Sequence, residues 1–265
     1  MALLKLRDGA DLYYEVHGQG PALLLVPGLG GVGTFFAEHL PQLAERFRVV
    51  VHDHRGTGRS TPSRIEYSVA QMTDDLVQLM DALGIAKAHL CGHSTGGAIG
   101  QTLALDRPER LDRLVLSATW TKADAYFLRL FEVRSETLRT AGPALYVKSN
   151  ALWMRPPVLT RDRLAQEAEL EAAAIAAFPP VEVMLSRIAA ICRFDRKAEL
   201  GRIRHKTLVF VARDDIVTPP YFSQELARLI PDARLVMLPD GGHFYPNVHG
   251  ETFRRTLTDF LSAKD

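Results

Sequence analysis

The chain has few of the features that mark disulfide-stapled, membrane-spanning or nucleic-acid-binding proteins. Its 265 residues include two cysteines, Cys91 and Cys192, too few for a disulfide framework, which favours reduced thiols in a cytoplasmic protein. No segment reaches about 18 consecutive apolar residues, and the first residues lack the apolar core and cleavage site of a secretory signal. The net charge is +1, with no basic block or stripe, so neither nucleic acid nor a membrane surface is expected as a partner.

The remaining composition is that of a globular protein with a full hydrophobic core. Hydrophobic residues make up 47% of the chain and charged residues 24%. A length of 265 residues fits one large domain or two small ones. The composition leaves the oligomeric state open between a monomer and a homodimer.

Short apolar segments alternate with helical patterns along most of the chain. Strand character is found at 2–7, 11–16, 22–27, 48–53, 88–91, 114–117, 207–212 and 234–238. Helical periodicity is found at 36–45, 68–83, 98–106, 222–230 and 252–261. Asp8-Gly9 predicts a hairpin between the first two strands, and Ser68 with Gln71 predicts a capping box. The alternation predicts an α/β fold, with a mostly parallel sheet covered by helices on both faces.

One stretch, residues 120–204, contains helical patterns and no strong strand. It holds both tryptophans and is interrupted by a Gly-Pro and two Pro-Pro pairs. We interpret it as a helical cap inserted over the carboxyl edge of the sheet, where open parallel sheets bind ligands. A longer helical layer is the plainer alternative. The predicted division is therefore a core of residues 1–119 and 205–265 with a cap of residues 120–204.

A serine stands in a glycine-rich turn directly after the predicted strand 88–91. The sequence GHSTG at 92–96 matches G-x-S-x-G, the nucleophile elbow in which a strand turns sharply into a helix and exposes a serine hydroxyl. The small residues that follow, Gly97, Ala98 and Gly100, would let that helix pack tightly under the turn. An ordinary serine in a glycine-rich turn is the alternative. The pattern favours Ser94 as a nucleophile for carbonyl carbon.

A base and a carboxylate follow two other predicted strands. His243 ends the glycine-rich segment 239–243, whereas the other histidines fall in less suitable contexts. Asp215 follows the strand 207–212 and stands four residues before Pro219, while its neighbour Asp214 would be a solvated loop charge. The chain order serine, aspartate, histidine is that of the α/β-hydrolases. The sequence therefore predicts a catalytic triad of Ser94, Asp215 and His243.

A further glycine-rich loop follows the predicted strand 22–27. The backbone N–H groups of Leu29, in this loop, and Thr95, after the nucleophile, are expected to form the oxyanion hole. The same loop, GLGGVG at 28–33, also matches a dinucleotide fingerprint with Asp53 as the distal acid. We disfavour that alternative because a triad accounts for three further loops. Residues 53–60 are interpreted as a loop that braces the edge of the site rather than as a charged substrate site.

Together these motifs resemble the α/β-hydrolase superfamily over nearly the whole chain. Pro27 stands where many members have histidine, but that side chain has no catalytic role. Within the superfamily, the chain looks most like the 3-oxoadipate enol-lactonases and the aminoacrylate (carbamate) hydrolases of pyrimidine utilisation. The segments at 53–58, 131–134 and 238–243 are closest to the second group. The resemblance implies an α/β-hydrolase fold and a serine hydrolase of a small-molecule ester, lactone, amide or carbamate, without a metal or organic cofactor.

The cap is expected to shape the substrate pocket. Candidate lining residues are Trp120, Tyr126, Phe127, Trp153 and Met154, and candidates for contact with a substrate carboxylate are Lys122, Arg129, Arg134 and Arg155. Ordinary core packing and solvated charges are the plainer interpretations of both sets. Two other functions are compatible with the motifs: a ligand sensor with slow turnover, and an acyl transferase or C–C hydrolase on the same scaffold.

Overall fold

Eight strands form one sheet in the part of the chain that the structure describes. The computed structural model describes residues 2–263, and residues 163–167 by their backbone alone. The strands are β1 (Ala2–Lys5), β2 (Asp11–His17), β3 (Ala22–Val26), β4 (Arg48–His52), β5 (Ala88–His93), β6 (Leu111–Ser117), β7 (Thr207–Ala212) and β8 (Ala233–Leu238). Their spatial order is β1-β2-β4-β3-β5-β6-β7-β8. The pairs β1–β2 and β2–β4 are antiparallel and the other five are parallel.

Both faces of the sheet are covered by helices, as the apolar strands require. Leu24 and Val26 of β3 belong to a cluster with α2 (Val69–Ala82), α3 (Thr95–Asp106) and α7 (Pro220–Leu229). Leu23 and Leu25 belong to a second cluster with α1 (Leu40–Leu43) and α9 (Gly250–Ser262). Successive side chains of a strand point to opposite faces, so β3 packs on both layers at once.

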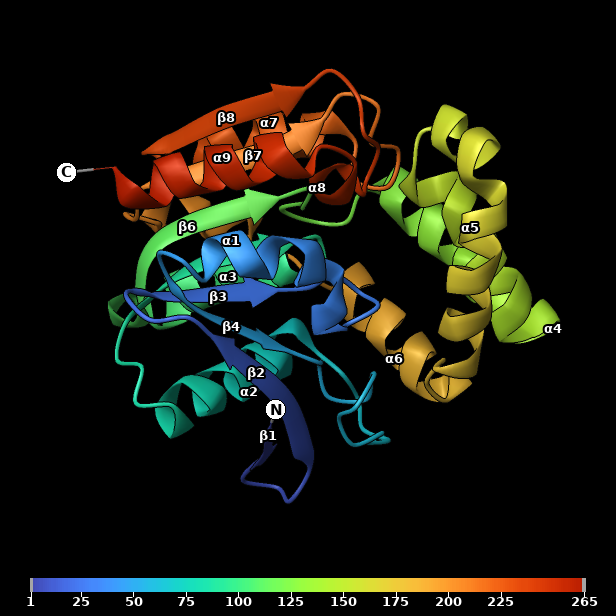
Figure 1. The fold of residues 1–265 in the computed structure, drawn as a ribbon, viewed down its shortest axis with the longest axis horizontal. Helices are drawn as coiled ribbons and strands as arrows, with labels where there is room; N and C mark the ends of the chain where they lie inside the picture. The colour runs from blue at the N-terminus through green and yellow to red at the C-terminus, as the bar shows by residue number, and fades with distance from the viewer. Residues whose placement is uncertain (1, 264–265) are drawn as a thin grey trace.

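The helical insertion lies at the carboxyl edge of the sheet. It contains α4 (Ala125–Met154), α5 (Pro157–Ala176) and α6 (Val181–Cys192), between β6 and β7. Figure 1 shows these helices beyond the arrowheads of β3, β6 and β8. Gly142, with φ 76° and ψ −176°, precedes Pro143 and breaks α4 into two helical segments. The parallel sheet, its two helical layers and this insertion confirm the predicted fold class, while the domain limits at 119/120 and 204/205 stay a prediction.

Several element boundaries differ from the expectation. The segment 36–45 is a 3-10 helix, η1 (Gly33–His39), followed by the short α1, because Pro41 supplies no N–H for a continuous helix. Strand β6 begins at Leu111, where the charged residues Asp112 and Arg113 obscured the apolar pattern. Ser68 caps α2 by accepting a hydrogen bond from the Gln71 N–H at 3.0 Å, but the Gln71 side chain bonds Asp75 instead of closing the capping box.

The remaining elements are the 3-10 helices η2 (Pro108–Arg110) and η3 (Lys197–Arg202) and the short α8 (Tyr245–Val248). Cys91 and Cys192 are both free thiols, and burial raises the pKa of Cys91 to about 12.

Among the described residues, no single helix combines the length and apolar content needed to cross a bilayer. Of the described helices, only the pair Ala168–Ala176 and Val181–Cys192, which is bent by 102°, is long and apolar enough when its two helices are taken together.

Candidate active site

Ser94 occupies the sharp turn between β5 and α3. Its backbone has φ 54° and ψ −116°, a conformation that non-glycine residues seldom adopt and that costs about 1–3 kcal/mol. The turn is held by the Ser94 N–H, which donates to the Ser117 carbonyl of the neighbouring strand β6 at 2.8 Å. Strain of this kind persists only where the surrounding structure fixes it, and it clusters at functional sites.

Gly92 and Gly96, on either side of the turn, must be glycine because other backbone atoms lie where a Cβ atom would be. A Cβ atom on Gly92 would lie 2.1 Å from the Gly96 carbonyl oxygen, and one on Gly96 would lie 2.0 Å from the Val26 carbonyl oxygen. No side chain fits at either position without moving the backbone. The pattern G-x-S-x-G is therefore a packing requirement of this turn, which favours the nucleophile elbow over an ordinary glycine-rich turn.

His243 and Asp215 meet at the same edge, after β8 and β7. The His243 Nδ1 lies 2.9 Å from the Asp215 Oδ2, and both side chains are buried. Asp215 Oδ1 accepts the N–H groups of Val217 at 2.8 Å and Thr218 at 3.0 Å, and Oδ2 accepts the Thr218 hydroxyl at 2.9 Å. A carboxylate held in this way fixes the orientation and tautomer of the imidazole.

Asp214 has a structural role that the sequence interpretation missed. It is exposed, as expected for a loop charge, and its carboxylate also accepts the N–H of Gly242 at 2.8 Å and that of Gly241 at 3.3 Å. These glycines immediately precede His243. Adjacent aspartates thus hold the same histidine in different ways: Asp215 binds its ring and Asp214 binds its loop.

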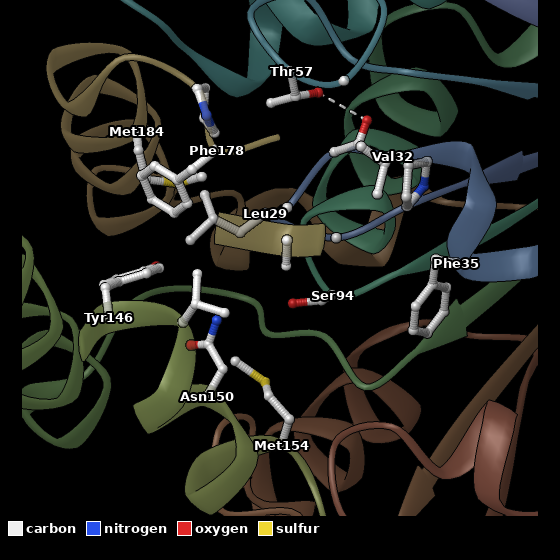
Figure 2. A pocket seen from close by; sticks show the side chains of 18 of the residues that line it. Leu29, Val32, Phe35, Thr57, Ser94, Tyr146, Asn150, Met154, Phe178 and Met184 are labelled. Atoms are coloured by element: carbon white, nitrogen blue, oxygen red, sulfur yellow. Dashed lines mark hydrogen bonds between the residues drawn. The ribbon is translucent and has the colours of Figure 1, made fainter. Parts of the chain in front are cut away.

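Ser94 and His243 line one cavity with a volume of about 470 Å³. Figure 2 shows the Ser94 side chain pointing into this space beside Leu29. The structure therefore brings together Ser94, His243 and the loop of Leu29, three sites far apart in the sequence. Each follows the carboxyl end of a strand, which is why they converge at one edge of the parallel sheet.

The two expected oxyanion donors are not engaged elsewhere. Thr95 is the first residue of α3, where helical N–H groups have no partner within the helix. Neither the Leu29 N–H nor the Thr95 N–H donates a hydrogen bond to another residue that the structure describes. The glycine-rich loop is braced from the segment 53–60, since the Thr57 hydroxyl donates to the Gly31 carbonyl at 2.9 Å (Figure 2).

The side chains of the segment 53–60 form hydrogen bonds with one another and with the neighbouring glycine-rich loop. Asp53 is buried and accepts the Gly33 N–H at 2.9 Å and the Arg59 guanidinium at 2.7 Å. The Arg59 hydrogen bonds offset the burial of Asp53 and hold its pKa below the usual range. With its oxygens occupied, Asp53 is not free to bind a ribose. These contacts support the bracing interpretation and weigh against a dinucleotide site.

Arg187 of α6 lies at the site although no motif in the sequence marks it. It is fully buried, and its guanidinium donates to the Leu29 carbonyl from Nε at 3.3 Å and from Nη2 at 3.0 Å. It also donates to the Arg55 carbonyl at 3.2 Å and to the His54 Nδ1 at 2.9 Å. Burial lowers the pKa of Arg187 to about 10, so it stays charged at neutral pH. Arg187 therefore ties the cap to the loop of Leu29.

His93, the residue before Ser94, lines the cavity as a neutral ring. Its Nδ1 lies 3.0 Å from the Ser117 hydroxyl, which lies 2.6 Å from the Tyr245 hydroxyl, and Tyr245 donates to the Phe210 carbonyl at 3.1 Å. This chain is satisfied when His93 donates from Nδ1, which leaves Nε2 as an unprotonated nitrogen without a partner among the described residues. Burial, and then the nearby His243, hold the pKa of His93 well below its usual value.

Five of the cap residues expected to bind substrate do not line the cavity: Trp120, Tyr126, Phe127, Arg129 and Trp153. Trp120 is fully buried against Phe127, with ring centroids 4.7 Å apart. Trp153 is half-buried and packs against the hydrophobic core. Tyr126 is largely exposed and donates its hydroxyl to the Ile216 carbonyl at 2.6 Å. Arg129 is exposed and pairs with Glu132 at 3.2 Å.

The cavity is lined by other parts of the cap. Met154 and Arg134 do line it, together with residues from both segments of α4, the end of α5 and α6. Lys122 instead pairs with Asp195 at 2.7 Å, and the Arg155 guanidinium lies 5.8 Å from the Phe244 ring. The helical patterns of residues 120–204 do not show that the break at Gly142 brings Tyr146 and Asn150 back to Arg134. These residues carried no separate motif.

A family model described as alpha/beta hydrolase fold matches residues 21–246. The chain belongs to the α/β-hydrolase family. Among the relatives of this α/β-hydrolase is a protein of Caulobacter vibrioides that bears the name carbamate hydrolase RutD. It is 43% identical over 261 residues, which cover 95% of this chain and 96% of the relative. The protein of the same name from Azorhizobium caulinodans is 40% identical over 256 residues, 97% of each chain.

Solved structures agree with the sequence relatives. The enol-lactonase from Burkholderia xenovorans LB400 superposes with a TM-score of 0.91 at 27% identity, covering 99% of this chain and all (100%) of the other. The two groups expected from the sequence motifs, carbamate hydrolases and enol-lactonases, are thus both among the relatives of this α/β-hydrolase. The resemblance drawn from the motifs is confirmed.

Proposed function

We propose that the protein is a serine hydrolase that cleaves a small-molecule ester, lactone, amide or carbamate through an acyl-enzyme. The observation that carries the proposal is the constellation at one cavity. Ser94 stands at a strained elbow, His243 lines the same cavity, and the His243 ring is bonded to the buried Asp215 at 2.9 Å. Among the described residues, no acceptor binds the N–H of Thr95, which follows the serine, or that of Leu29, which lines the same cavity. This is the arrangement that acyl transfer requires.

The mechanism follows from the roles of these groups. Ser94 Oγ attacks the carbonyl carbon while His243 removes its proton through Nε2, because Nδ1 is engaged by Asp215. The Leu29 and Thr95 N–H groups stabilise the oxyanion of the tetrahedral intermediate. His243 then donates its proton to the leaving oxygen or nitrogen, and a water molecule activated by His243 releases the acyl group.

The neutral state of His93 assists this cycle. The ring centroids of His93 and His243 lie 4.9 Å apart. A positive charge on His93 would oppose the imidazolium that His243 becomes during attack. Since burial keeps the pKa of His93 low, the proton can reside on His243 without a cationic neighbour there.

The names of the relatives support the substrate class. Proteins 40–43% identical over nearly the whole chain bear the name of a carbamate hydrolase, and a structural neighbour is an enol-lactonase. Both reactions attack an acyl carbonyl with an oxygen or nitrogen leaving group. The site of this chain has the groups for both, which is why we keep esters, lactones, amides and carbamates in one proposal.

Replacement of the nucleophile tests the reaction class. We expect Ser94→Ala to lower kcat for p-nitrophenyl acetate by roughly 10³- to 10⁶-fold, because no other group replaces the nucleophile. Ser262→Ala, at the exposed end of α9, is the matched control and should retain full activity. A fluorophosphonate probe should label the wild-type protein and not Ser94→Ala. Full turnover by Ser94→Ala would refute the serine mechanism. Labelling without turnover of any ester, lactone or carbamate would favour a ligand sensor.

A further inference from the structure

Arg134 of α4 is a buried cation on the cap side of the cavity. The residue is 4% exposed, and its Nη2 donates to the Tyr146 hydroxyl and the Asn150 Oδ1, both at 2.9 Å. The buried Nε has no hydrogen-bond partner. Among the described residues, no carboxylate pairs with this guanidinium. Only Nη2 of its three nitrogens has acceptors among the described residues, so Nη1 is left without one in a side chain that lines the same cavity as Ser94.

Unsatisfied N–H groups distinguish Arg134 from the other buried arginines among the described residues. Arg55 is paired with Asp75 at 2.7 Å, Arg187 has acceptors for all three nitrogens although no described carboxylate pairs with it, and Arg113 donates to the Phe260 and Ala263 carbonyls. A buried N–H without an acceptor is costly, because it has lost its hydrogen bonds to water without a replacement. The guanidinium lies 4.9 Å from the Phe131 ring centroid and 5.1 Å from that of Tyr146. These aromatic faces stabilise the cation but leave its N–H groups unsatisfied.

The size and lining of the cavity describe the rest of the ligand. Carbamate has four non-hydrogen atoms, which at roughly 30 Å³ for each water-sized group fill about a quarter of a cavity of about 470 Å³. Apolar side chains line much of the remaining space, among them Leu29, Met154, Phe178 and Met184 (Figure 2). The cavity fits a larger molecule with an apolar body and a polar end.

We propose that Arg134, supported by Asn150 and Tyr146, binds a carboxylate at the end of the substrate remote from the bond that Ser94 cleaves. This inference rests on the proposed function and names its substrate class: acyl compounds with an apolar linker and a free terminal carboxylate. Guanidinium N–H groups are the donors best matched to carboxylate geometry. Figure 2 shows Tyr146 and Asn150 beside the space into which Ser94 points. The sheet side of the cavity performs the chemistry, and the cap side selects the charge of the acyl chain.

A matched pair of esters tests this subsite. One is the p-nitrophenyl monoester of adipate, with a free carboxylate, and the other is its methyl ester, which is neutral. We expect wild-type kcat/KM to favour the free carboxylate. Arg134→Met should lower that kcat/KM by about 10- to 100-fold, mainly through KM, because charge-assisted hydrogen bonds are lost. The neutral ester should change much less, and Arg134→Lys should retain part of the preference. Arg139→Met, exposed on the same helix, is the control.

Two further arms separate the possible failures. Inhibition of the wild-type enzyme by adipate and by dimethyl adipate measures the subsite without any substitution, and adipate should compete more strongly. Equal treatment of the two esters by the wild-type protein would overturn the subsite, as would equal loss for both in Arg134→Met. If Ser94→Ala is inactive while no charge preference exists, only the subsite fails. If Ser94→Ala retains turnover, the proposed function itself fails.

Discussion

The two sides of the cavity hold their residues in different ways. On the sheet side, Ser94, Asp215 and His243 follow β5, β7 and β8 directly, and backbone groups fix them: the Ser117 carbonyl binds the Ser94 N–H, and two N–H groups bind Asp215. On the cap side, α4 is broken at Gly142, and Arg134 keeps a buried nitrogen without a partner. Ser94, Asp215 and His243 are thus held in place before a ligand arrives, whereas the Arg134 guanidinium keeps a nitrogen without a partner among the described residues.

Under the proposed function, the two sides have different tasks. Catalytic geometry tolerates little displacement, so it belongs on elements whose positions the strand register determines. Selectivity needs shape and charge that vary between relatives, and a helical insertion provides them without disturbing the sheet. Substitutions on the sheet side should therefore lower turnover of every substrate, whereas substitutions at Arg134 should change which substrate is preferred.

Among the variants that compare the two sides, the largest effect is expected from Asp215, the aspartate of the proposed triad. Asp215→Asn should lower kcat by about 10⁴-fold for both charged and neutral esters, because an amide stabilises the wrong tautomer of His243. Asp214→Asn is the matched control one residue away. It weakens only the contact with the Gly241 and Gly242 N–H groups and should lower kcat by about 10-fold or less. Equal losses in the two variants would show that the loop position, not the His243–Asp215 bond, carries the effect.

The sequence predicted the sheet side far better than the cap side. Ser94, Asp215 and His243 each stand directly after an apolar strand, so local pattern and parallel topology sufficed to bring them to one edge. Arg134 lies within one of the segments that carried the resemblance, but its role depends on the fold of α4 back onto itself at Gly142. Trp120 shows the converse, since it packs on Phe127 and Phe194 outside the cavity. Periodicity identifies an apolar face but not the element that it contacts.

Acid should destabilise the sheet-bearing part of the chain and leave the cap without a direct contribution. Burial lowers the pKa of His39 and of His52 to about 4, and residues 120–204 contain no histidine. Below the unfolded pKa of about 6.5, the unfolded chain binds protons that the folded protein does not. Stability is therefore lost as pH falls from about 6.5, by roughly 2 kcal/mol for each of these histidines at pH 5. Urea unfolding between pH 7 and 5 measures the slope.

Single variants test whether the buried histidines cause this loss of stability at low pH. His52→Gln should flatten the dependence of unfolding free energy on pH, because the group that takes up a proton only on unfolding is gone. Replacement of the partly exposed His249, for which no such burial exists, serves as the control. A constant unfolding free energy between pH 7 and 5 would contradict the assignment of neutral buried histidines.

A substitution at Arg187 tests most directly whether the two sides of the cavity act separately. It belongs to α6 of the insertion, yet its guanidinium binds the Leu29 carbonyl in the loop expected to stabilise the oxyanion. We expect Arg187→Met to lower kcat by about 10- to 100-fold for both esters with little change in KM, because the Leu29 N–H loses its fixed direction. Arg187→Lys should restore part of kcat, since a lysine can donate to one carbonyl but cannot bridge Leu29 and Arg55. A change confined to KM, or to the charged ester, would instead place Arg187 among the selectivity residues. A uniform loss in kcat with partial rescue by lysine would show that the insertion also holds the catalytic loop, so that cap and sheet act as one site at this contact.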